Sequence, residues 1–454
     1  MDSAFDADLL VVGGGMAGMS AACWAADQGA RVLVVEKAAE IGGSAVLSAG
    51  MFWTAADAQD IATVDPEQDR AFGPLLVEGY DAGANWMESL GVHVGPEVEM
   101  GQALGWRGRG RAIDVLGHVR TCRAHVQAAG GWVITDATVE CLATVDGRVT
   151  GARVRDRDGT TEVRAPHVLL ATGGYQGSDE LLRKYYGDHA AGLLLRANPN
   201  STGDGIVLAE SVGGVMRTPA PSFYGHLLPS PLHRPLTPAD FGRISQYYTG
   251  RALLFDKQGQ RFVDESDAHY YGNAVAVSQQ PGRRALVVGD DRLRQEDLAA
   301  SYPGQGQNDR VLEAKRDGAH AVLADSMEAL DAAVRDWGYS GISAGVALYN
   351  SQIEAGDAAM TPGRKRCRDT FTQAPFFAVE VQPAITFTFR GLRTDVDGRV
   401  LDADGRPIPG LLAAGADAAF YKKKYFGGLS MSLIFALRAA RTALAQAPVP
   451  APAS

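Results

Sequence analysis

The sequence predicts a doubly wound α/β domain with an α+β domain inserted into it. Three observations support this fold class: a βαβ pattern opens the chain, buried-strand patterns return near its end, and the segment between them is richer in Pro and aromatic residues. The 454 residues provide enough chain for two or three domains. We expect residues 1–205 and 373–454 to form the α/β domain and residues 206–372 to form the inserted domain.

The N-terminal segment has the order strand, glycine turn, helix, strand. An apolar strand at 8–12 leads into a GxGxxG turn, an Ala-rich helix runs to about residue 28, and a second strand at 31–36 ends on Glu36. In such a Rossmann-like unit, Gly13 permits the tight turn, Gly15 lets a pyrophosphate approach the helix N-terminus, and Gly18 lets helix and strand pack closely. Glu36 would accept a hydrogen bond from a ribose hydroxyl. The segment therefore predicts a dinucleotide-binding site.

Hydrophobic periodicity and turn residues predict the remaining elements. Helices are expected at 67–90, 115–130, 326–337 and 429–445, an antiparallel meander at 132–155 with a further turn at 158–159, a buried strand at 168–174, a hairpin at 252–262, and β-type structure again from 376 and at 411–415. The tail 447–454 alternates Ala and Pro, which is typical of disorder.

Charge and cysteine content exclude several classes of protein. The 53 acidic against 43 basic residues give a net charge of −10, opposite to the balance typical of nucleic-acid binding. The four cysteines lie far apart without a CxxC motif, which indicates no metal site and suits a reducing compartment. Residues 9–26 are apolar and long enough for a bilayer, but three glycines interrupt them and no Lys or Arg precedes them. We expect a cytoplasmic protein with no membrane insertion and no nucleic-acid partner.

Further glycine-rich segments follow the opening motif in a defined order. They are Ile41–Ser44, Ser48–Gly50, Ala171–Gly174, Thr202–Gly205, Ala414–Asp417 and Gly427–Ser430. With this ordered set the sequence resembles the flavoprotein subunits of fumarate reductase and succinate dehydrogenase, a family that also contains the 3-ketosteroid dehydrogenases. The resemblance covers nearly the whole chain. It implies an FAD-binding domain, a capping domain that carries part of the substrate site, and an active site where the two meet.

The resemblance also implies which residues lie along FAD. These are Gly13, Gly15, Met16, Ala17, Gly18, Glu36, Lys37, Gly42, Gly43, Ser44, Ala49, Gly50, Ala171, Thr172, Gly173, Gly174, Asp204, Gly415, Asp417, Gly428, Ser430, Ser432 and Leu433. Asp417 is expected to hold the ribityl or phosphate region. Ser44 stands about where succinate dehydrogenases carry the histidine that bonds FAD, which implies non-covalent FAD. No second strand–GxGxxG–helix unit is evident, so a separate electron donor or acceptor is expected.

A segment of the inserted domain resembles the family's GxRFxNE motif, which is followed by a proton carrier. The segment is Gly259–Tyr271, and the position of the carrier falls on His269, with Tyr270 beside it. A histidine that titrates near neutrality, or a perturbed tyrosine, can move a proton at a carbon next to a carbonyl. A histidine with no catalytic role is the alternative. In that case the base is expected among Tyr224, Tyr247 and Tyr248.

The residues by which fumarate reductases bind two carboxylates are missing. Phe387 stands where that family carries a histidine, and Tyr425 stands where it carries an arginine. Ketosteroid dehydrogenases have a tyrosine at the latter position, and its hydroxyl, with a nearby backbone N–H (that of Leu429 here), holds the ketone oxygen. Arg390 and Arg393, expected on one face of a strand, are candidates to bind a carboxylate, and solvent-facing arginines are equally compatible with the pattern.

These observations favour α,β-dehydrogenation of a cyclic ketone, steroid-like or smaller, or the reverse reduction of an enone. Two alternatives stay open. One is a fumarate- or urocanate-type reductase of an activated alkene carboxylate that uses Arg390 or Arg393. The other is a non-catalytic electron-transfer flavoprotein subunit, against which the missing haem and Fe–S ligands weigh.

Overall fold

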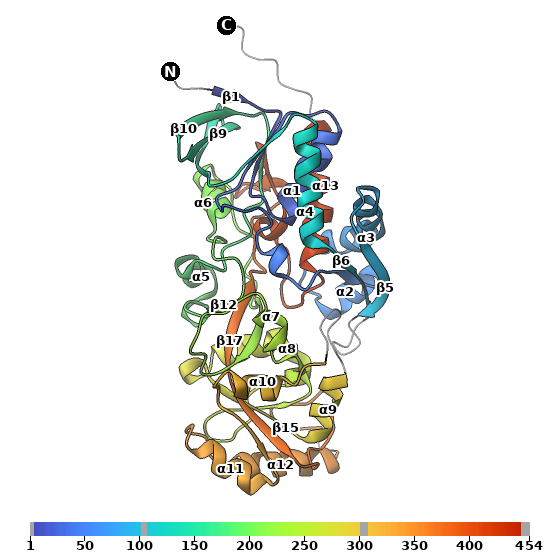
Figure 1. The fold of residues 1–454 in the computed structure, drawn as a ribbon, viewed down its shortest axis with the longest axis vertical. Coiled ribbons are helices and arrows are strands. Elements are labelled where there is room, and N and C mark those ends of the chain that lie inside the picture. The colour runs from blue at the N-terminus through green and yellow to red at the C-terminus, as the bar shows by residue number, and fades with distance from the viewer. Residues whose placement is uncertain (1–3, 101–106, 300–306, 357, 446–454) are drawn as a thin grey trace. The chain divides into compact units, whose positions relative to one another are not determined.

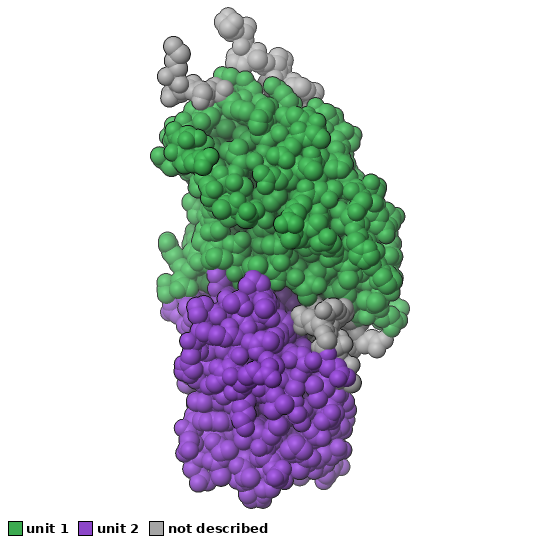
Figure 2. Space-filling view, viewed as in Figure 1, with its two compact units in different colours: residues 1–186, 197–221, 387–454 green, residues 187–196, 222–386 purple. Residues whose placement is uncertain are grey.

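A computed structural model of the chain describes residues 4–100, 107–299, 307–356 and 358–445, without the side chains of His269, Tyr270 and Ala299 (Figure 1). The chain forms two compact units, which Figure 2 shows in separate colours. The first unit comprises residues 1–186, 197–221 and 387–454, and the second comprises 187–196 and 222–386. The larger segment of the second unit thus starts at residue 222, where the sequence suggests 206, and ends at 386, where it suggests 372.

A parallel sheet forms the core of the first unit, as predicted. Its strand order is β18-β19-β11-β2-β3-β7, and the five strands from β19 to β7 are parallel. The strands are β2 (Leu9–Val12), β3 (Val32–Val35), β7 (Trp132–Ile134), β11 (Val168–Leu170), β18 (Arg399–Leu401) and β19 (Pro407–Ala413). β2, β3 and β11 are buried along their whole length, which is why they read as continuous apolar runs.

Three helices pack together in this unit (Figure 1). They are α1 (Met16–Asp27), α4 (Val115–Ala128) and α13 (Gly428–Ala445), and α1 contacts both of the others as well as β2 and β3. Ala and Gly dominate α1, so its neighbours can approach from several sides. Among the described helices, α13 is the one long and apolar enough to cross a bilayer, but 67% of it is buried inside the protein. Such burial is that of a core helix.

Two smaller sheets complete the first unit. One contains β1 (Ala4–Asp6), β8 (Thr138–Val145), β9 (Arg148–Asp156) and β10 (Gly159–Arg164); the other contains β4 (Met51–Ala55), β5 (Val94–Met100) and β6 (Gly108–Ile113). The helices are α2 (Ala58–Val64), α3 (Phe72–Ser89), α5 (Asp179–Tyr186) and α6 (Asp204–Ser211), with short 3₁₀ turns at Ala45–Leu47 and Gly415–Ala418.

The prediction that residues 132–155 form one meander is wrong at its start. Trp132–Ile134 pairs in parallel with β3 and extends the central sheet, while the meander begins at Thr138. The reason is that α4 returns the chain to the sheet edge, where the short apolar run completes a βαβ unit. The predicted helix at 67–90 is also shorter, because α2 ends before it and α3 starts at Phe72.

A mixed sheet around one long strand forms the core of the second unit. β17 (Phe376–Phe387) pairs with β12 (Leu194–Leu195), β13 (Tyr224–Pro229), β15 (Ala285–Gly289) and β16 (Ala321–Ala324), and β14 (Leu253–Phe255) pairs with β15. The helices are α7 (Asp240–Arg243), α8 (Glu265–Ser278), α9 (Asp291–Ala299), α10 (Arg310–Arg316), α11 (Met327–Arg335) and α12 (Ile342–Glu354). The predicted hairpin at 252–262 exists as β14 and a single bridge from Phe255 to Arg261.

Candidate active site

The glycine turn after β2 has three glycines with different surroundings. A Cβ on Gly13 would lie 2.3 Å from the Ala171 carbonyl oxygen, and one on Gly18 would lie 1.9 Å from that of Gly13, so both positions exclude any side chain. A Cβ on Gly15 would meet nothing nearer than the Gly42 oxygen at 3.9 Å. The N-terminus of α1 has no side-chain cap and no acidic residue in its first turn. Its uncapped N–H groups and the open space beside Gly15 fit a pyrophosphate.

A second backbone segment borders this turn. The Gly42 N–H donates to the Gly14 oxygen over 2.8 Å, and Gly43 lies so close that its Cβ would stand 3.6 Å from the Gly15 Cα. Ser44 follows, and its hydroxyl accepts a hydrogen bond from the Asn198 N–H over 3.1 Å. Two of the expected FAD contacts, Gly42 and Gly43, are therefore brought beside Gly15. Further along, Ala49 is exposed and Gly50 is buried.

The two charged residues at the end of β3 have different partners. Glu36 is 8% exposed, and its carboxylate accepts hydrogen bonds from the N–H groups of Gly14 (2.7 Å) and Ala38 (2.8 Å). Lys37 donates to the Thr202 hydroxyl over 2.6 Å and pairs with Asp204 over 2.8 Å. The structure thus places Glu36 at the glycine turn, as a ribose-binding carboxylate requires, and links Lys37 to Asp204.

Asp417 joins the loops that follow two neighbouring strands. It is 0% exposed and accepts hydrogen bonds from the N–H groups of Thr172 (2.6 Å) and Gly174 (2.9 Å) and from the Thr172 hydroxyl. A Cβ on Gly205 would lie 2.4 Å from its carboxylate, which explains the glycine in the segment Thr202–Gly205. Burial raises the pKa of Asp417 above its usual value. The carboxylate holds the β11 and β19 loops together, a role beyond the expected contact with FAD.

The start of α13 is packed against the rest of the first unit. The Ser430 hydroxyl donates to the Trp53 carbonyl oxygen, and the Leu433 side chain is 0% exposed. Ser432 is half-buried, and Gly415 stands so close to α1 that its Cβ would lie 2.9 Å from the Ala17 Cβ. Because the Ser430 and Leu433 side chains serve packing, the backbone of this segment is what it can offer to a cofactor.

Tyr425 stands in an aromatic cluster at the N-terminus of α13. Its ring lies 5.4 Å from Trp53, 6.0 Å from Phe387 and 6.1 Å from Phe389, to which it is nearly parallel. A Cβ on Gly428 would lie only 2.5 Å from the Tyr425 hydroxyl oxygen. The hydroxyl is therefore beside the first residues of α13, where Leu429 follows and where the helix dipole favours negative charge. The predicted pair of Tyr425 and the Leu429 N–H is brought together at this helix end.

A buried carboxylate anchors the loop that leads to Tyr425. Asp65 is 1% exposed and accepts hydrogen bonds from the N–H groups of Lys423 (2.9 Å) and Lys424 (3.1 Å). Burial raises the pKa of Asp65 above its usual value. The side chain of Lys422 donates to the carbonyl oxygens of Thr218 and Pro219. The run of lysines is therefore fixed to the protein and leads directly into the tyrosine.

The expectation that Arg390 and Arg393 share one face of a strand is wrong. β17 ends at Phe387, and the chain bends before Arg390, whose Nε donates to the Arg217 carbonyl oxygen over 2.7 Å. Its guanidinium lies 5.0 Å from the centre of the Tyr185 ring. Arg393 is exposed and lies against the turn at Gly405. The alternation expected for a strand does not apply, because this segment pairs only through isolated bridges.

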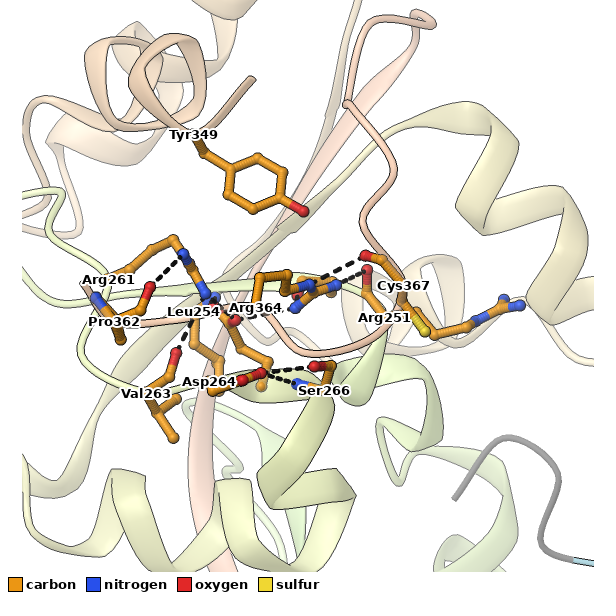
Figure 3. A network of polar contacts seen from close by, with 12 residues as sticks. Arg251, Leu254, Arg261, Val263, Asp264, Ser266, Tyr349, Pro362, Arg364 and Cys367 are labelled. Atoms are coloured by element: carbon orange, nitrogen blue, oxygen red, sulfur yellow. Dashed lines mark hydrogen bonds and ion pairs between the residues drawn. The ribbon is translucent and has the colours of Figure 1, made fainter. Parts of the chain in front are cut away.

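In the second unit, the motif Gly259–Glu265 fixes the start of α8 (Figure 3). Glu265 is 0% exposed and binds two arginines, Arg261 over 2.6 Å and Arg364 over 2.9 Å, together with the Leu254 N–H over 2.9 Å. Asp264 caps the helix by accepting the Ser266 N–H and hydroxyl, which Figure 3 shows. The network positions the helix whose backbone carries His269 and Tyr270. The side chains of these two predicted proton carriers lie outside the described residues.

A buried histidine next to this helix escaped the sequence analysis. His226 on β13 is 1% exposed, and its ring centre lies 5.0 Å from that of Tyr224 and 5.1 Å from that of Tyr247. Burial, aided by the positive charge of Arg196, lowers the pKa of His226 well below its usual value. Tyr271 on α8 lies 6.0 Å from Tyr224. Two of the alternative bases therefore surround a neutral imidazole beside α8, whereas Tyr248 packs on Phe377 in the core. The sequence signal that could have identified His226 is its position beside the aromatic residues Phe223 and Tyr224.

A comparison with known families decides what the glycine turn binds. A family model of an FAD-binding domain matches residues 8–428. The chain belongs to this FAD-binding family. FAD is its cofactor, and the turn at Gly13–Gly18, Glu36 and the Gly42–Gly43 segment are the residues that fit it.

Proteins of known function with similar sequences include reductases. The chain is 26% identical to "Fumarate reductase (cytochrome)" of Shewanella frigidimarina, over 90% of this chain and 71% of that protein. It is 29% identical to "Vinyl phenol reductase" of Lactiplantibacillus plantarum, over 91% and 90% of the two chains. The fold is also that of 3-ketosteroid delta1-dehydrogenase from Sterolibacterium denitrificans, with a TM-score of 0.75, 19% identity and coverage of 97% and 99%. This member of the FAD-binding family is accordingly an FAD-dependent oxidoreductase.

Gly15→Val should abolish FAD binding without disturbing the fold. Its φ of −82° and the open space around it permit a side chain, so the valine would fill only the space that the pyrophosphate needs. FAD released by acid precipitation measures the binding; release of all the flavin from the wild type would also show that it is not covalently bound. Gly363→Val, at an exposed position of the second unit where a Cβ would meet nothing nearer than an Asp264 oxygen at 3.8 Å, is the control and should keep FAD. FAD binding by Gly15→Val at wild-type affinity would contradict the assignment.

Glu265→Gln should destabilise the second unit by about 3–5 kcal/mol, because two buried arginines lose their shared anion. Asp267→Asn, two residues on in α8, removes an exposed pair with Lys365 and should cost less than about 1 kcal/mol. Urea unfolding of both variants measures the difference. Equal midpoints for the two variants would show that the network does not stabilise α8.

Proposed function

We propose that this FAD-dependent oxidoreductase introduces or reduces a C=C bond conjugated to a carbonyl group. The proposed substrate is a cyclic ketone or enone, steroid-like or smaller. The observation that carries the proposal is the Tyr425 hydroxyl at the N-terminus of α13 within a cluster of aromatic rings. Bound FAD supplies hydride transfer to or from the substrate carbon. The protein's own part is to bind the ring, to polarise its oxygen and to move one proton.

Tyr425 donates a hydrogen bond to the substrate oxygen, and the Leu429 N–H donates a second. Both become stronger as negative charge builds on that oxygen, and the dipole of α13 acts in the same sense. Burial raises the pKa of the neighbouring Tyr421 well above its usual value, and its hydroxyl donates to the Gly427 carbonyl oxygen. Tyr421 therefore supports the turn before α13 and leaves Tyr425 as the donor.

Transfer of the proton at the carbon next to the carbonyl is assigned to a residue of α8. His269, with Tyr270 as the alternative, is the proposed carrier, and the network around Glu265 supports this by fixing the start of the helix. His226 is kept neutral by burial, so it can donate from one ring nitrogen and accept at the other. It is a proposed contact for a polar group of the substrate.

A dicarboxylate is a poorer fit to these residues. Phe387 and Tyr425, two of the positions at which fumarate reductases place cationic or imidazole groups, offer only rings and one hydroxyl. Burying a carboxylate without a partner costs several kcal/mol. Arg390, whose guanidinium lies 5.0 Å from the centre of the Tyr185 ring, supports the alternative of an alkene carboxylate such as urocanate.

A vinyl phenol is a second candidate substrate. The vinyl phenol reductase of Lactiplantibacillus plantarum matches this chain along nearly the full length of both proteins. A vinyl phenol also carries an oxygen on a ring conjugated to a C=C bond, so the same hydroxyl and helix end can stabilise its negative charge. A separate electron donor or acceptor, which no segment of this chain supplies by motif, is part of the proposal.

Anaerobic flavin absorbance tests the substrate class directly. Saturated cyclic ketones should bleach the oxidised flavin, and after reduction cyclic enones should restore its colour much faster than fumarate or urocanate. Restoration by vinyl phenols alone would select the second candidate. Fumarate turnover at a rate comparable with the best cyclic enone would overturn the proposal, and no response to any of these compounds would favour an electron-transfer flavoprotein.

Tyr425→Phe should lower kcat by about 10²–10³ while FAD stays bound, because one donor to the developing oxyanion is lost. Tyr421→Phe removes a hydroxyl of the same cluster that bonds only the Gly427 backbone among the hydrogen bonds described. It should cost about 1 kcal/mol of stability and little activity. Steady-state rates with the substrate found above separate the two variants. Equal losses in both would show that the cluster acts through packing.

A further inference from the structure

Four potential metal ligands meet between α1 and α4, at the end of α1 remote from the glycine turn. Cys23 and Asp27 are four residues apart on α1, and Cys122 and His125 are three residues apart on α4, so each pair lies on one face of its helix. The two helices pack together along these faces. The wide spacing of the cysteines in the sequence hid this arrangement, since the fold brings two of them together.

The donor atoms of three of these residues, Cys23, Asp27 and His125, are close enough together to share one ion. The Cys23 sulfur lies 4.0 Å from one Asp27 carboxylate oxygen, and the His125 Nδ1 lies 3.2 Å from the other. Donor atoms of Cys23, Asp27 and His125 all lie within 4.8 Å of one another. Zinc ligands at about 2.0–2.3 Å form a tetrahedron with edges of roughly 3.3–3.8 Å. Cys122 lies outside this group of three but next to it, because the neighbouring Cys23 thiol, followed by burial, raises the pKa of the Cys122 thiol well above its usual value.

The surroundings are those of a supported site with an entry path. Cys23 and Cys122 are both 0% exposed, whereas the side chains of Asp27 and His125 are 36% and 37% exposed. The His118 Nε2 lies 3.6 Å from the Cys122 sulfur and 2.9 Å from the Ser20 hydroxyl oxygen. Hydrogen-bonding groups next to metal ligands orient those ligands in metal sites, and His118 stands in such a position beside Cys122. An ion can enter past the carboxylate and the imidazole and reach the thiols behind them.

We propose that Cys23, Asp27, Cys122 and His125 bind one zinc-like divalent cation. Two thiolates, one imidazole and one carboxylate are ligands that Zn²⁺ accepts in a closed tetrahedral site. Binding releases the two thiol protons to solvent, and no redox change occurs. The ion ties the end of α1 to α4 and has a structural role. The proposal rests on this cluster alone and does not depend on the substrate class proposed above.

The experiment uses FAD-loaded protein that has been reduced with a phosphine, treated with a chelator and freed of both reagents. Zn²⁺ added in excess and then removed by gel filtration should leave one equivalent bound. Co²⁺ should give ligand-field bands of a tetrahedral site at wavelengths longer than those at which the flavin absorbs. Cys23→Ser and His125→Asn should each weaken Zn²⁺ binding by 10-fold or more, as measured by competition with a chromophoric chelator. His125 is half-exposed, so its variant should fold even where Cys23→Ser does not.

Cys141→Ser is the matched control, because Cys141 is an exposed free cysteine on β8 and should leave the affinity unchanged. Three outcomes would overturn the proposal. These are the absence of retained zinc, zinc binding that survives both ligand variants, and a Cys23–Cys122 disulfide that persists after reduction. Because zinc retention is measured without substrate, its failure leaves the FAD assignment and the proposed reaction untouched.

Discussion

The buried carboxylate of Asp417 sets the geometry on which the cofactor site depends. At the carboxyl ends of parallel strands the chain must turn away, and the N–H groups exposed there lose their partners in the sheet. Asp417 accepts two of these N–H groups, at Thr172 and Gly174, and holds the Thr172 hydroxyl as well. That hydroxyl in turn accepts the Gly205 N–H over 3.0 Å. Three chain segments far apart in the sequence are thereby fixed at the carboxyl ends of the parallel strands.

Buried carboxylates also fix the other two positions that the proposed reaction uses. Asp65 accepts hydrogen bonds from two backbone N–H groups that precede Tyr425. Glu265 binds two arginines and the Leu254 N–H at the start of α8. A buried carboxylate is costly unless it is hydrogen-bonded, and each of these three accepts at least two hydrogen bonds, although those of Asp65 go to one oxygen and its other oxygen has no partner among the described residues. The cost restricts the alternatives, because a shifted loop would leave a buried charge without partners. Rigid placement of a helix or a tyrosine follows from that penalty.

How much of this the sequence predicts depends on whether the signal is local. The strand, turn and helix at residues 8–28 have their whole signal within one short segment, and the structure confirms them within one or two residues. Trp132–Ile134 was assigned to the wrong sheet because its partner, β3, lies about 100 residues earlier in the chain. The Glu265 motif was recognised, but its partner Arg364 carries no sequence signal of its own. His226 and the Cys23–Cys122 pair were missed for the same reason, since only the packing of distant elements places them.

The polarity of the cluster around Tyr425 limits what can bind beside it. Trp53, Phe387 and Phe389 surround the tyrosine with apolar surface. Two cations of the first unit already have partners: Arg217 binds Asp69 and the Thr394 carbonyl oxygen, and Lys422 binds two carbonyl oxygens. Burial lowers the pKa of Arg217 to about 10. In such surroundings one neutral donor suits an oxygen that carries little charge in the ground state and more in the transition state. A group charged from the outset would lose its hydration on entry and gain only one hydroxyl and a helix end. In the proposed reaction the cluster therefore discriminates through the charge that develops on the substrate oxygen, which is the property that raises kcat and not merely affinity.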